Sequence, residues 1–399
     1  MFDYRICVSA MGSYQMRAHV PDTPDLSPGG LLIIDLSAIR ANYRHLSHLV
    51  RPAVSGGVVK ANAYGLGAGH VAPLLYDEGC RHFFVAHLSE ALALRPLIPA
   101  DAEIYVLNGL GPGSEPAAAA ARVHPVLNSI AQIKAWGALA SVRGETLPAA
   151  LQVDTGMSRL GLSAAEVSEL LASPNLLDGI EPALLMSHLA CADERDNVAN
   201  QEQLTVFQSL AEKLPGARRS FANSGGIFLG SAYQFDVARP GVALYGVTPI
   251  DGGDVAMTPV VRLDARVIQI REIPPGAGIG YGLTHRSTGP MRLATLAIGY
   301  ADGWHRCLSG RGSAYFNGVR LPIVGRVSMD SMTVDVGGLA PGDLGPGDYI
   351  ELIGPHQTLA HVAADAGTIP YEILTSLGQR YRRIYVDGDS RPSPSMDAL

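Results

Sequence analysis

The stretch Val58–Gly67, VVKANAYGLG, places a lysine directly after two β-branched residues. Two valines followed by Asn62, Gly65 and Gly67 indicate a buried strand that ends and turns into a loop. A lysine held at a strand end in a partly apolar setting has its pKa lowered toward the neutral amine. An amine can attack a carbonyl group and form a Schiff base. Considered alone, Lys60 is more simply a surface lysine after an edge strand, so its role depends on the rest of the chain.

The segments that follow this stretch alternate between strand-like and helix-like patterns. The strand-like runs are residues 57–60, 83–86, 104–107, 123–127, 150–153, 183–187, 220–222 and 235–237. Helical candidates between them include residues 70–78, 89–97, 164–172 and 201–214. Eight such units over roughly 190 residues match a closed (β/α)8 barrel of the TIM type. A doubly wound open sheet is the alternative, but no GxGxxG opens any of the units.

The segment before the first unit is of a different kind. Residues 1–30 are interpreted as an irregular N-terminal extension that ends in a Ser-Pro-Gly-Gly loop. An apolar strand is expected at 31–36, followed by a helix that Ser37 would cap. We therefore predict a barrel domain over residues 31–254.

The chain after residue 255 is rich in β-type residues and is punctuated by glycine and proline. Residues 260–273 and 293–298 are strand-like, and 316–319, FNGV, carries the Asn-Gly hairpin signal. We predict a mainly β C-terminal domain over 255–399, with one helix near 371–377.

Composition excludes several classes of protein. The 37 acidic residues outnumber 30 basic ones among 399 residues, and no basic run suggests a nucleic-acid surface. The start of the chain lacks a continuous apolar core, and no run is long enough to span a bilayer, so neither a signal peptide nor a membrane protein is expected. The four cysteines form no CxxC pair, so neither a metal site nor a redox pair is predicted: Cys7, Cys80, Cys191 and Cys307. A cytoplasmic protein with reduced thiols is expected.

Polar residues gather where the predicted strands end, which is where barrel enzymes carry out their chemistry. They are Lys60, Tyr64, Asp154, Thr155, Met157, Arg159, His188, Asp193, Asn223, Ser224 and Arg239. Each has a plainer explanation: His188 fits a satisfied core histidine, and Asp154 or the pair Asn223-Ser224 fits a helix cap. Five loops on one rim nevertheless indicate a site.

Two of these loops are rich in small residues. Segments 224–226, SGG, and 239–241, RPG, let backbone N–H groups approach an anion, and barrels often bind phosphate after strands seven and eight. A Schiff-base lysine and a phosphate site on one rim together suggest pyridoxal phosphate.

Eight motifs, in this order and over most of the chain, resemble the alanine racemases: VVKANAYGLG, DTGMSRLG, MSHLACADE, FANSGG, ARPGVALYG, GIGYGLTH, IGYADGW and GRVSMDSMTVDV. Only residues 1–30 and about the last dozen lie outside the resemblance. It implies a pyridoxal phosphate enzyme that interconverts L-alanine and D-alanine and supplies D-alanine for peptidoglycan.

The resemblance assigns the two catalytic roles. Lys60 would carry the cofactor and act as the base for the α-proton of the D-enantiomer, and Tyr281 would be the base on the opposite face, for the L-enantiomer. In this family the tyrosine comes from the second subunit, so a homodimer is implied. A tyrosine pKa near ~10 is high for a base, so positive charge nearby, such as His188 linked to Arg239, would have to lower it.

The resemblance also assigns the surrounding residues. Arg239 would face the pyridine nitrogen, and because arginine keeps its proton it can only donate there. This weakens the ring as an electron sink and disfavours transamination. Met329 would contact the substrate carboxylate through its backbone, and Arg159 would lie near the ring oxygen and that carboxylate. The residues expected around the phosphate are Tyr64, Ser224, Gly241, Val242 and Gln379, and Tyr300 would lie over the phosphate and the entrance. His188 and Asn223 would contact the cofactor elsewhere. The residues expected at the entrance are Asp193, Arg306 and Arg326.

Two positions depart from the family pattern. Gln152 stands where many members have a carbamylated lysine that braces Arg159, and a neutral amide cannot supply that charge. Gln379 stands where a tyrosine is common, which would enlarge the pocket. A racemase for serine or for a broader set of amino acids is therefore the nearest alternative.

Two more distant alternatives remain. A decarboxylase would need a cysteine or carboxylate at the position of Tyr281. A non-catalytic pyridoxal phosphate carrier would be a bare barrel, without the β-rich segment.

Overall fold

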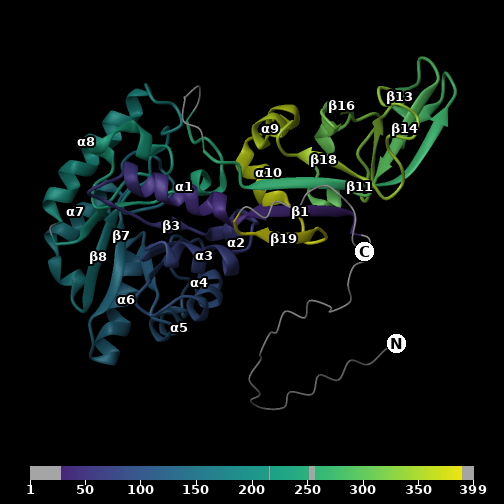
Figure 1. Ribbon diagram of the computed structural model, residues 1–399. Helices are drawn as coiled ribbons and strands as arrows, with labels where there is room; N and C mark the ends of the chain where they lie inside the picture. Colours follow the sequence, from purple (N-terminus) through teal and green to yellow (C-terminus); the bar gives the residue numbers. More distant parts are fainter. Residues whose placement is uncertain (1–27, 215, 251–256, 389–399) are drawn as a thin grey trace, which may run out of the picture.

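The computed structural model describes residues 28–214, 216–250 and 257–388 and shows a barrel joined to a second, mainly β domain (Figure 1). The expected extension 1–30 and the polar tail 387–399 lie almost wholly outside the described residues. No helix in these ranges is long and apolar enough to cross a membrane.

The barrel is built from the eight strand segments that the sequence predicts, each of which overlaps an observed strand. Seven of them form one parallel sheet: β3 (Gly57–Val58), β4 (His82–Val85), β5 (Glu103–Val106), β6 (His124–Leu127), β7 (Leu147–Gln152), β8 (Ile180–Met186) and β9 (Arg218–Ser220). The eighth, β10 (Val237–Ala238), pairs in parallel with β2 (Val54–Ser55) just before β3.

Backbone hydrogen bonds close the barrel on both sides of β10. Asp236 N–H donates to the Arg219 carbonyl at 3.0 Å, and Val58 N–H donates to the Pro240 carbonyl at 3.0 Å. Strands this short are buried on both faces, which is why they are runs of apolar residues without alternation. The predicted (β/α)8 barrel is confirmed.

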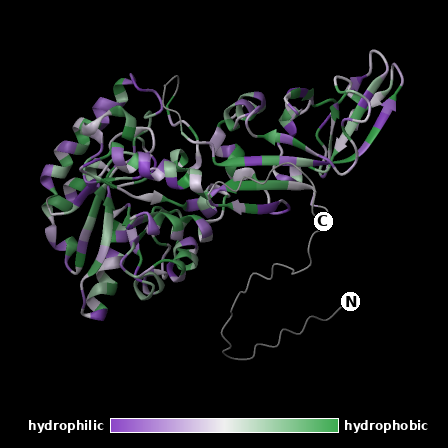
Figure 2. Cartoon of the chain, in the orientation of Figure 1, coloured by the Kyte–Doolittle hydropathy of each residue, from purple (hydrophilic) through white to green (hydrophobic). Residues whose placement is uncertain are grey.

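Helices cover the outside of the barrel: α1 (Leu36–Leu49), α3 (Ala68–Asp77), α4 (Leu88–Leu94), α5 (Glu115–Ala120), α6 (Ile130–Arg143), α7 (Ala164–Ala172) and α8 (Val198–Lys213). In Figure 2 their inner faces and the strands are hydrophobic, whereas their outer faces are hydrophilic. The last two units carry only short 3-10 turns after their strands, such as η5 (Val242–Tyr245), and α1 packs against η5. The outer position beside the eighth strand is therefore occupied by α1, which precedes the first barrel strand in the chain.

The C-terminal domain is a mainly β structure that the sequence predicts in outline. Its strands are β11 (Val261–Ile273), β12 (Gly278–Ile279), β13 (His285–Arg286), β14 (Met291–Leu296), β15 (Ser313–Phe316), β16 (Val319–Pro322), β17 (Met332–Asp335), β18 (Tyr349–Ile353) and β19 (Arg382–Val386). The predicted Asn-Gly hairpin joins β15 to β16, with φ of 48° at Asn317 and 80° at Gly318. Such positive values suit this turn.

Two local expectations in and around this domain are corrected here, and the position of the strand expected at 31–36 is a third. Two helices, α9 (Leu359–Ala366) and α10 (Pro370–Ser376), precede β19 where one was expected. Asp35, not Ser37, caps α1, because the strand ends there and the Asp35 carboxylate accepts the Ala38 N–H at 2.9 Å.

The strand expected at the start of the barrel domain lies in the other sheet. β1 (Gly30–Asp35) runs antiparallel to β11 and parallel to β19, between the two. Leu32 and Ile34 are fully buried there. The first strand of the segment 31–254 therefore belongs to the C-terminal sheet. An apolar strand can pair with any open strand edges that bury it, and here these are the edges of β11 and β19.

Candidate active site

Lys60 stands at the carboxyl end of the first barrel strand, as the sequence predicts, but the segment after it is not an ordinary loop. α2 (Lys60–Tyr64) is a turn in which Ala61, Asn62, Ala63 and Tyr64 all have φ between 52° and 55°. Left-handed backbone costs roughly 1–2 kcal/mol per residue for side chains other than glycine. The turn is therefore held in place by its surroundings rather than by its own preference.

Hydrogen bonds secure this turn at both ends. Gly65 N–H donates to the Ala61 carbonyl and Ala63 N–H to the Val59 carbonyl, both at 2.8 Å. The Asn62 side chain accepts the Ala68 N–H at 2.8 Å, which ties the turn to the start of α3. Lys60 thus projects from a fixed backbone at the barrel mouth.

The charges around Lys60 are mostly positive. Burial lowers the pKa of the Lys60 ammonium, Arg159 and Arg239 lower it further, and Glu90 opposes them. Burial also lowers the pKa of His188 to about 3, with Arg239, Arg159 and Lys60 adding to the effect. His188 is therefore neutral at physiological pH. A neutral His188 would not itself supply the positive charge expected near Tyr281, so in the pair His188–Arg239 that charge would lie on Arg239.

Arg239 is the buried cation of the site, with 3% of its surface exposed. Its guanidinium donates to the Ser187 carbonyl at 2.6 Å, to the Phe221 carbonyl at 3.5 Å and to the Ser220 hydroxyl. All three acceptors are neutral, and burial lowers the pKa of Arg239 to about 9. The group still carries its proton at neutral pH, and no carboxylate of the described residues hydrogen-bonds to it.

The two small-residue loops meet, as the sequence predicts. The Ser224 hydroxyl accepts the N–H groups of Gly241 at 2.8 Å and Ala243 at 3.3 Å. Tyr64 lies against the same loop: a Cβ at Gly241 would lie only 2.5 Å from the Tyr64 hydroxyl. The Asn223 side chain accepts the Gly226 N–H at 2.9 Å and so caps the adjoining turn. This contact is the capping role that the sequence offered as the simpler explanation.

The loop after β7 is braced internally. The Asp154 carboxylate accepts the N–H groups of Gly156, Met157 and Ser158 at 2.9–3.1 Å, which is the capping role considered for it. Gln152 is buried as the last residue of β7. Arg159 is exposed, and among the described residues no hydrogen bond or ion pair to another side chain holds it.

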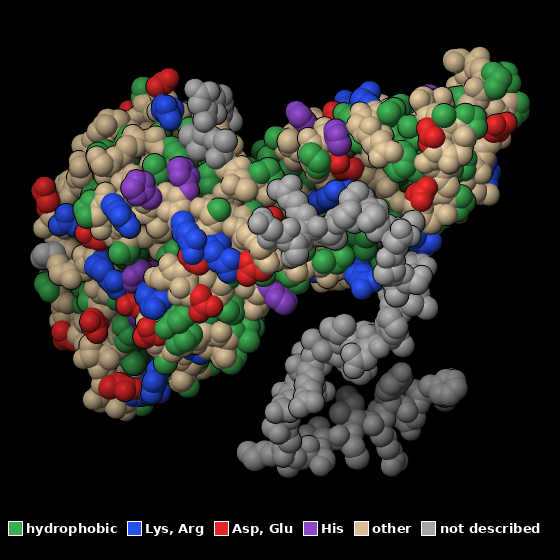
Figure 3. Space-filling model, viewed as in Figure 1, with side chains coloured by type: hydrophobic (Ala, Val, Ile, Leu, Met, Phe, Trp, Pro, Cys, Tyr) green, Lys and Arg blue, Asp and Glu red, His purple; other side chains and the backbone are tan. Residues whose placement is uncertain are grey.

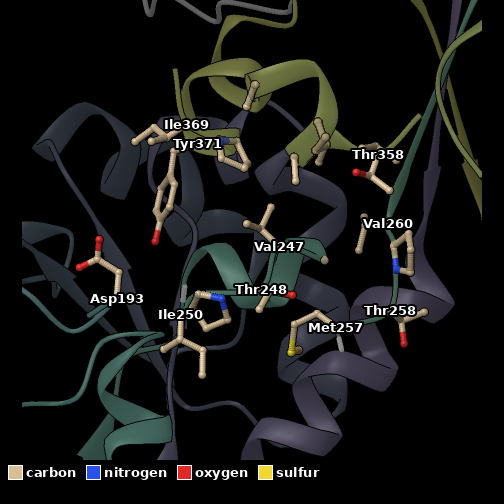
Figure 4. Close-up of a pocket in the computed structure, with 18 of the residues that line it drawn as sticks. Asp193, Val247, Thr248, Ile250, Met257, Thr258, Val260, Thr358, Ile369 and Tyr371 are labelled. Carbon is tan, nitrogen blue, oxygen red and sulfur yellow. The ribbon is translucent and has the colours of Figure 1, made fainter. Parts of the chain in front are cut away.

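A cavity of about 1290 Å³ lies beside these residues, between the barrel mouth and the C-terminal domain. His188, Asn223 and Met157 reach its wall, whereas Lys60 and Arg239 do not line it. Figure 4 shows Tyr371 of α10 and Asp193 from the loop after β8 on the same side of this cavity. Burial and the Asp193 charge raise the pKa of Tyr371 to about 12.

Tyr371 is a site residue that the sequence reasoning missed. Its ring lies 6.3 Å from the Tyr64 ring, centroid to centroid. Gln379 is exposed and does not line the cavity. Tyr371 therefore places an aromatic ring near Tyr64, and Gln379, which was expected to enlarge the pocket, does not line this cavity. The local sequence around Tyr371 predicts a helix, and it carries no signal that the helix packs against Tyr64.

Three other predicted site residues lie together on the C-terminal domain, apart from Lys60. Tyr281, Tyr300 and Met329 are 71%, 42% and 53% exposed. Tyr300 N–H donates to the Ser328 carbonyl at 3.0 Å, which places two of their loops side by side. Arg326 lies next to Gly280 and Gly282, which flank Tyr281.

The arrangement of the two domains separates these residues from the barrel mouth. The β12–β13 hairpin that carries Tyr281 is at the far end of the C-terminal domain from α2 (Figure 1). Hydrophobic side chains are exposed at that end in Figure 3. Arg306, also exposed, belongs to the same domain, in η8 (Arg306–Leu308). One chain therefore gathers Lys60, Tyr64, Arg159, His188, Asn223, Ser224, Arg239, Gly241 and Val242, and leaves Tyr281, Tyr300 and Met329 elsewhere.

Comparison with known proteins agrees over both domains. The models of the alanine racemase N-terminal and C-terminal domains match residues 34–249 and 260–385. An alanine racemase of Brucella canis is 53% identical over 378 residues, 92% of this chain and 96% of that protein. A catabolic alanine racemase of Agrobacterium fabrum is 54% identical over 370 residues, 93% of this chain and 95% of that protein.

A solved structure shares the same fold. The crystal structure of alanine racemase from Bartonella henselae with covalently bound pyridoxal phosphate has a TM-score of 0.86 and 47% sequence identity, and the match covers 90% of this chain and 99% of that one. With a barrel-mouth lysine, a buried arginine and matches across both domains, this chain belongs to the alanine racemase family.

Proposed function

We propose that this protein interconverts L-alanine and D-alanine with pyridoxal phosphate bound covalently by Lys60. The observation that carries the proposal is a half-buried lysine of lowered pKa at the mouth of a barrel, beside a buried arginine that has no carboxylate partner among residues 28–214, 216–250 and 257–388. A related protein of the same fold holds that cofactor covalently. Curated relatives over half identical to this chain are named alanine racemases.

The residues present fit the cofactor. A primary amine of lowered pKa suits an aldehyde, and the surplus positive charge at the mouth suits a phosphate. Gly241 lets the Tyr64 hydroxyl approach the loop closely, since a Cβ at that position would lie only 2.5 Å from it. Tyr64, Ser224, Gly241 and Val242 would hold the phosphate, with His188 and Asn223 nearby.

Pyridoxal phosphate, when bound, supplies an electron-withdrawing ring that makes the α-proton of an amino acid easier to remove. The Lys60 Nζ is the base that takes this proton from D-alanine and returns one to that face. Arg239 would donate to the ring nitrogen and, because it stays protonated, would keep that nitrogen from accepting a proton. Arg159 and the Met329 backbone would bind the substrate carboxylate, and Tyr300 would cover the entrance with Asp193.

We propose that the second base, the Tyr281 hydroxyl, comes from a second copy of this chain. Racemisation needs proton transfer on both faces of the substrate, and in one chain Tyr281 stands on a different domain from Lys60. Tyr281, Tyr300 and Met329 form an exposed apolar group, which favours an interface between copies. A symmetric homodimer would place this group over the partner's barrel mouth.

The D-alanine formed would serve peptidoglycan synthesis, and the protein would act in the cytoplasm on a free amino acid. The alternative of a serine or broad-specificity racemase is less well supported. It depended on Gln379, which is exposed, whereas Tyr371 occupies the space next to Tyr64.

Isotope exchange at Cα tests the two bases. In heavy water, Tyr281→Phe should slow deuterium uptake from L-alanine by about 10²-fold or more, because its base is lost. Uptake from D-alanine should persist, because Lys60 still serves that face. Borohydride bleaching of the visible absorbance, with the label found on Lys60, tests cofactor attachment. An equal loss of exchange from both enantiomers would contradict the assigned roles.

Mixing two inactive chains tests the shared site. Chains carrying Lys60→Ala or Tyr281→Phe, unfolded and refolded together, should regain about a quarter of the wild-type racemase rate. Half of the dimers would be mixed, and each mixed dimer would hold one intact site. No recovery, in a preparation shown to contain mixed dimers, would place both bases in one chain.

A further inference from the structure

Glu90, in the first turn of α4, contacts the segment that carries Lys60. Its Oε1 accepts the N–H of Ala61, the residue after Lys60, at 2.5 Å. Its Oε2 accepts the N–H groups of Ala86 at 2.8 Å and His87 at 3.0 Å, where β4 leads into α4. One carboxylate therefore joins the first βα unit of the barrel to the second, next to the lysine.

The contact with Ala61 falls where the backbone is most unusual. Ala61 is the first of the four left-handed residues, with φ of 52°, and is exposed. A left-handed residue that is not glycine needs support from its neighbours. Glu90 provides an acceptor for the N–H that follows the Lys60 carbonyl group, so it sets the direction in which the lysine leaves the backbone.

The charge of Glu90 has a second effect on Lys60. The charged groups that act on the Lys60 ammonium are Arg159, Glu90 and Arg239, and Lys60 in turn acts on His188. Of these, Glu90 is the one that stabilises the ammonium form. It limits how far the pKa of Lys60 falls, so that the amine can take up a proton as well as release one.

Glu166 in α7 provides a matched comparison within the same barrel. Its Oε2 accepts the Ser163 N–H at 3.0 Å, and its Oε1 accepts the Ile130 N–H, at the start of the preceding helix α6, at 3.1 Å. The geometry is the same: a glutamate at the third position of a helix reaches back to its own cap and across to the preceding unit. No site residue is adjacent to Ile130, so this contact serves the fold alone.

We propose that Glu90 is a positioning residue for Lys60, holding the left-handed turn through the Ala61 N–H and partly offsetting the positive charge at the barrel mouth. Its consequence for racemisation rests on the proposed function, whereas its effect on the lysine does not.

The test measures the reactivity of Lys60 directly. The chain has only three lysines, Lys60, Lys134 and Lys213, so the other two serve as internal references. The full-length protein, freed of pyridoxal phosphate, is labelled with acetic anhydride across a pH series, and labelling at each lysine is read by peptide mass spectrometry. In Glu90→Gln the midpoint for Lys60 should move down by about 1 pH unit, because a stabilising negative charge is removed. The midpoints of Lys134 and Lys213 should not move.

Two further variants separate charge from position. Glu166→Gln should leave the Lys60 midpoint and the racemase kcat unchanged. Glu90→Asp keeps the charge but shortens the reach, so the Lys60 midpoint should stay near wild type while kcat falls on the order of 10²-fold through misplacement of the amine.

The proposal is overturned if Glu90→Gln leaves the Lys60 midpoint in place, if Glu166→Gln shifts it equally, or if Glu90→Asp has the wild-type kcat. A protein without racemase activity in which Glu90→Gln still shifts the midpoint would instead refute the proposed function and keep Glu90 as the partner of Lys60.

Discussion

The two ends of the barrel hold the same kinds of side chain in opposite electrostatic states. At the amino end, where β4, β5 and β9 begin, Arg218 donates to both Glu103 oxygens at 2.9 and 2.8 Å and to His82 Nε2 at 3.0 Å. At the carboxyl end, Arg239 donates only to neutral acceptors and His188 is surrounded by cations. The amino end balances its charges, whereas the carboxyl end leaves them unbalanced.

The amino-end cluster also sets the neighbours of His82. Because Arg218 can only donate, His82 Nε2 accepts from it, and His82 Nδ1 lies 3.0 Å from a Glu103 oxygen. Burial alone would raise the pKa of Glu103, but His82, Tyr105 and Arg218 together lower it to about 2. This end is built for stability. The mouth accepts a less stable arrangement that an anionic ligand can complete.

The largest effect is expected at the mouth. Lys60→Met should lower racemase activity by about 10⁴-fold, since it removes both the point of attachment and a base. The same change should raise the free energy of unfolding of the cofactor-free chain. The folded pKa of Lys60 lies below its unfolded value, so its protonation opposes folding at neutral pH, and this cost fades as the pH rises from the folded pKa to the unfolded pKa, above which it is gone. Urea unfolding at pH 7 measures this change. A lower free energy of unfolding in Lys60→Met than in the wild type would contradict the contrast between the two ends.

At the amino end the opposite result is expected. Glu103→Gln should lower the free energy of unfolding by about 2 kcal/mol, because hydrogen bonds to a charged group are lost, while the racemase kcat stays near wild type. Since the folded pKa of Glu103 is depressed from 4.5 to about 2, its stabilisation is present above pH 4.5 and is lost as the pH falls toward 2. Unfolding measured across that range should show a shallower pH dependence in the variant. An unchanged slope would show that Glu103 adds nothing there.

The smallest effect concerns strained backbone at each end. Ala61 at the mouth and Arg122, just before β6 at the amino end, have φ of 52° and 53°, and both are exposed. Glycine at either position should raise the free energy of unfolding by about 0.5 kcal/mol. Only Ala61→Gly should also lower kcat, by a few-fold, because only that turn carries Lys60. Equal kcat in both variants would show that the turn does not need to be rigid.

The sequence was sufficient for the barrel because its strands are short apolar runs between clear helical patterns. Lys60, Ser224 and Arg239 could be placed on one rim for the same reason: residues that follow parallel strands share an edge. The pairing partner of β1 could not be predicted, since an apolar strand does not specify which open edge it joins. Nor could the left-handed turn, because Ala61 and Ala63 carry none of the glycine signal that usually marks positive φ.

Contacts between distant segments account for the other features that the sequence did not predict. Tyr371 reaches Tyr64 only because α10 packs against α2, and no local pattern encodes that. Glu90 has an ordinary place in the first turn of a helix, and only the fold brings its second oxygen to Ala61. Burial keeps His188 neutral, and Arg239, Arg159 and Lys60, from three different loops, add to the lowering of its pKa.

The position of β1 has a consequence for how the protein is made. Its partners, β11 and β19, are translated long after it, so on the ribosome an apolar strand must wait unpaired while the whole barrel emerges. The second domain can be finished only when the last strand is released. A gene fragment that starts after the barrel would lack the strand that joins β19 to the rest of the sheet, so the two halves cannot be produced separately by cutting the gene between them.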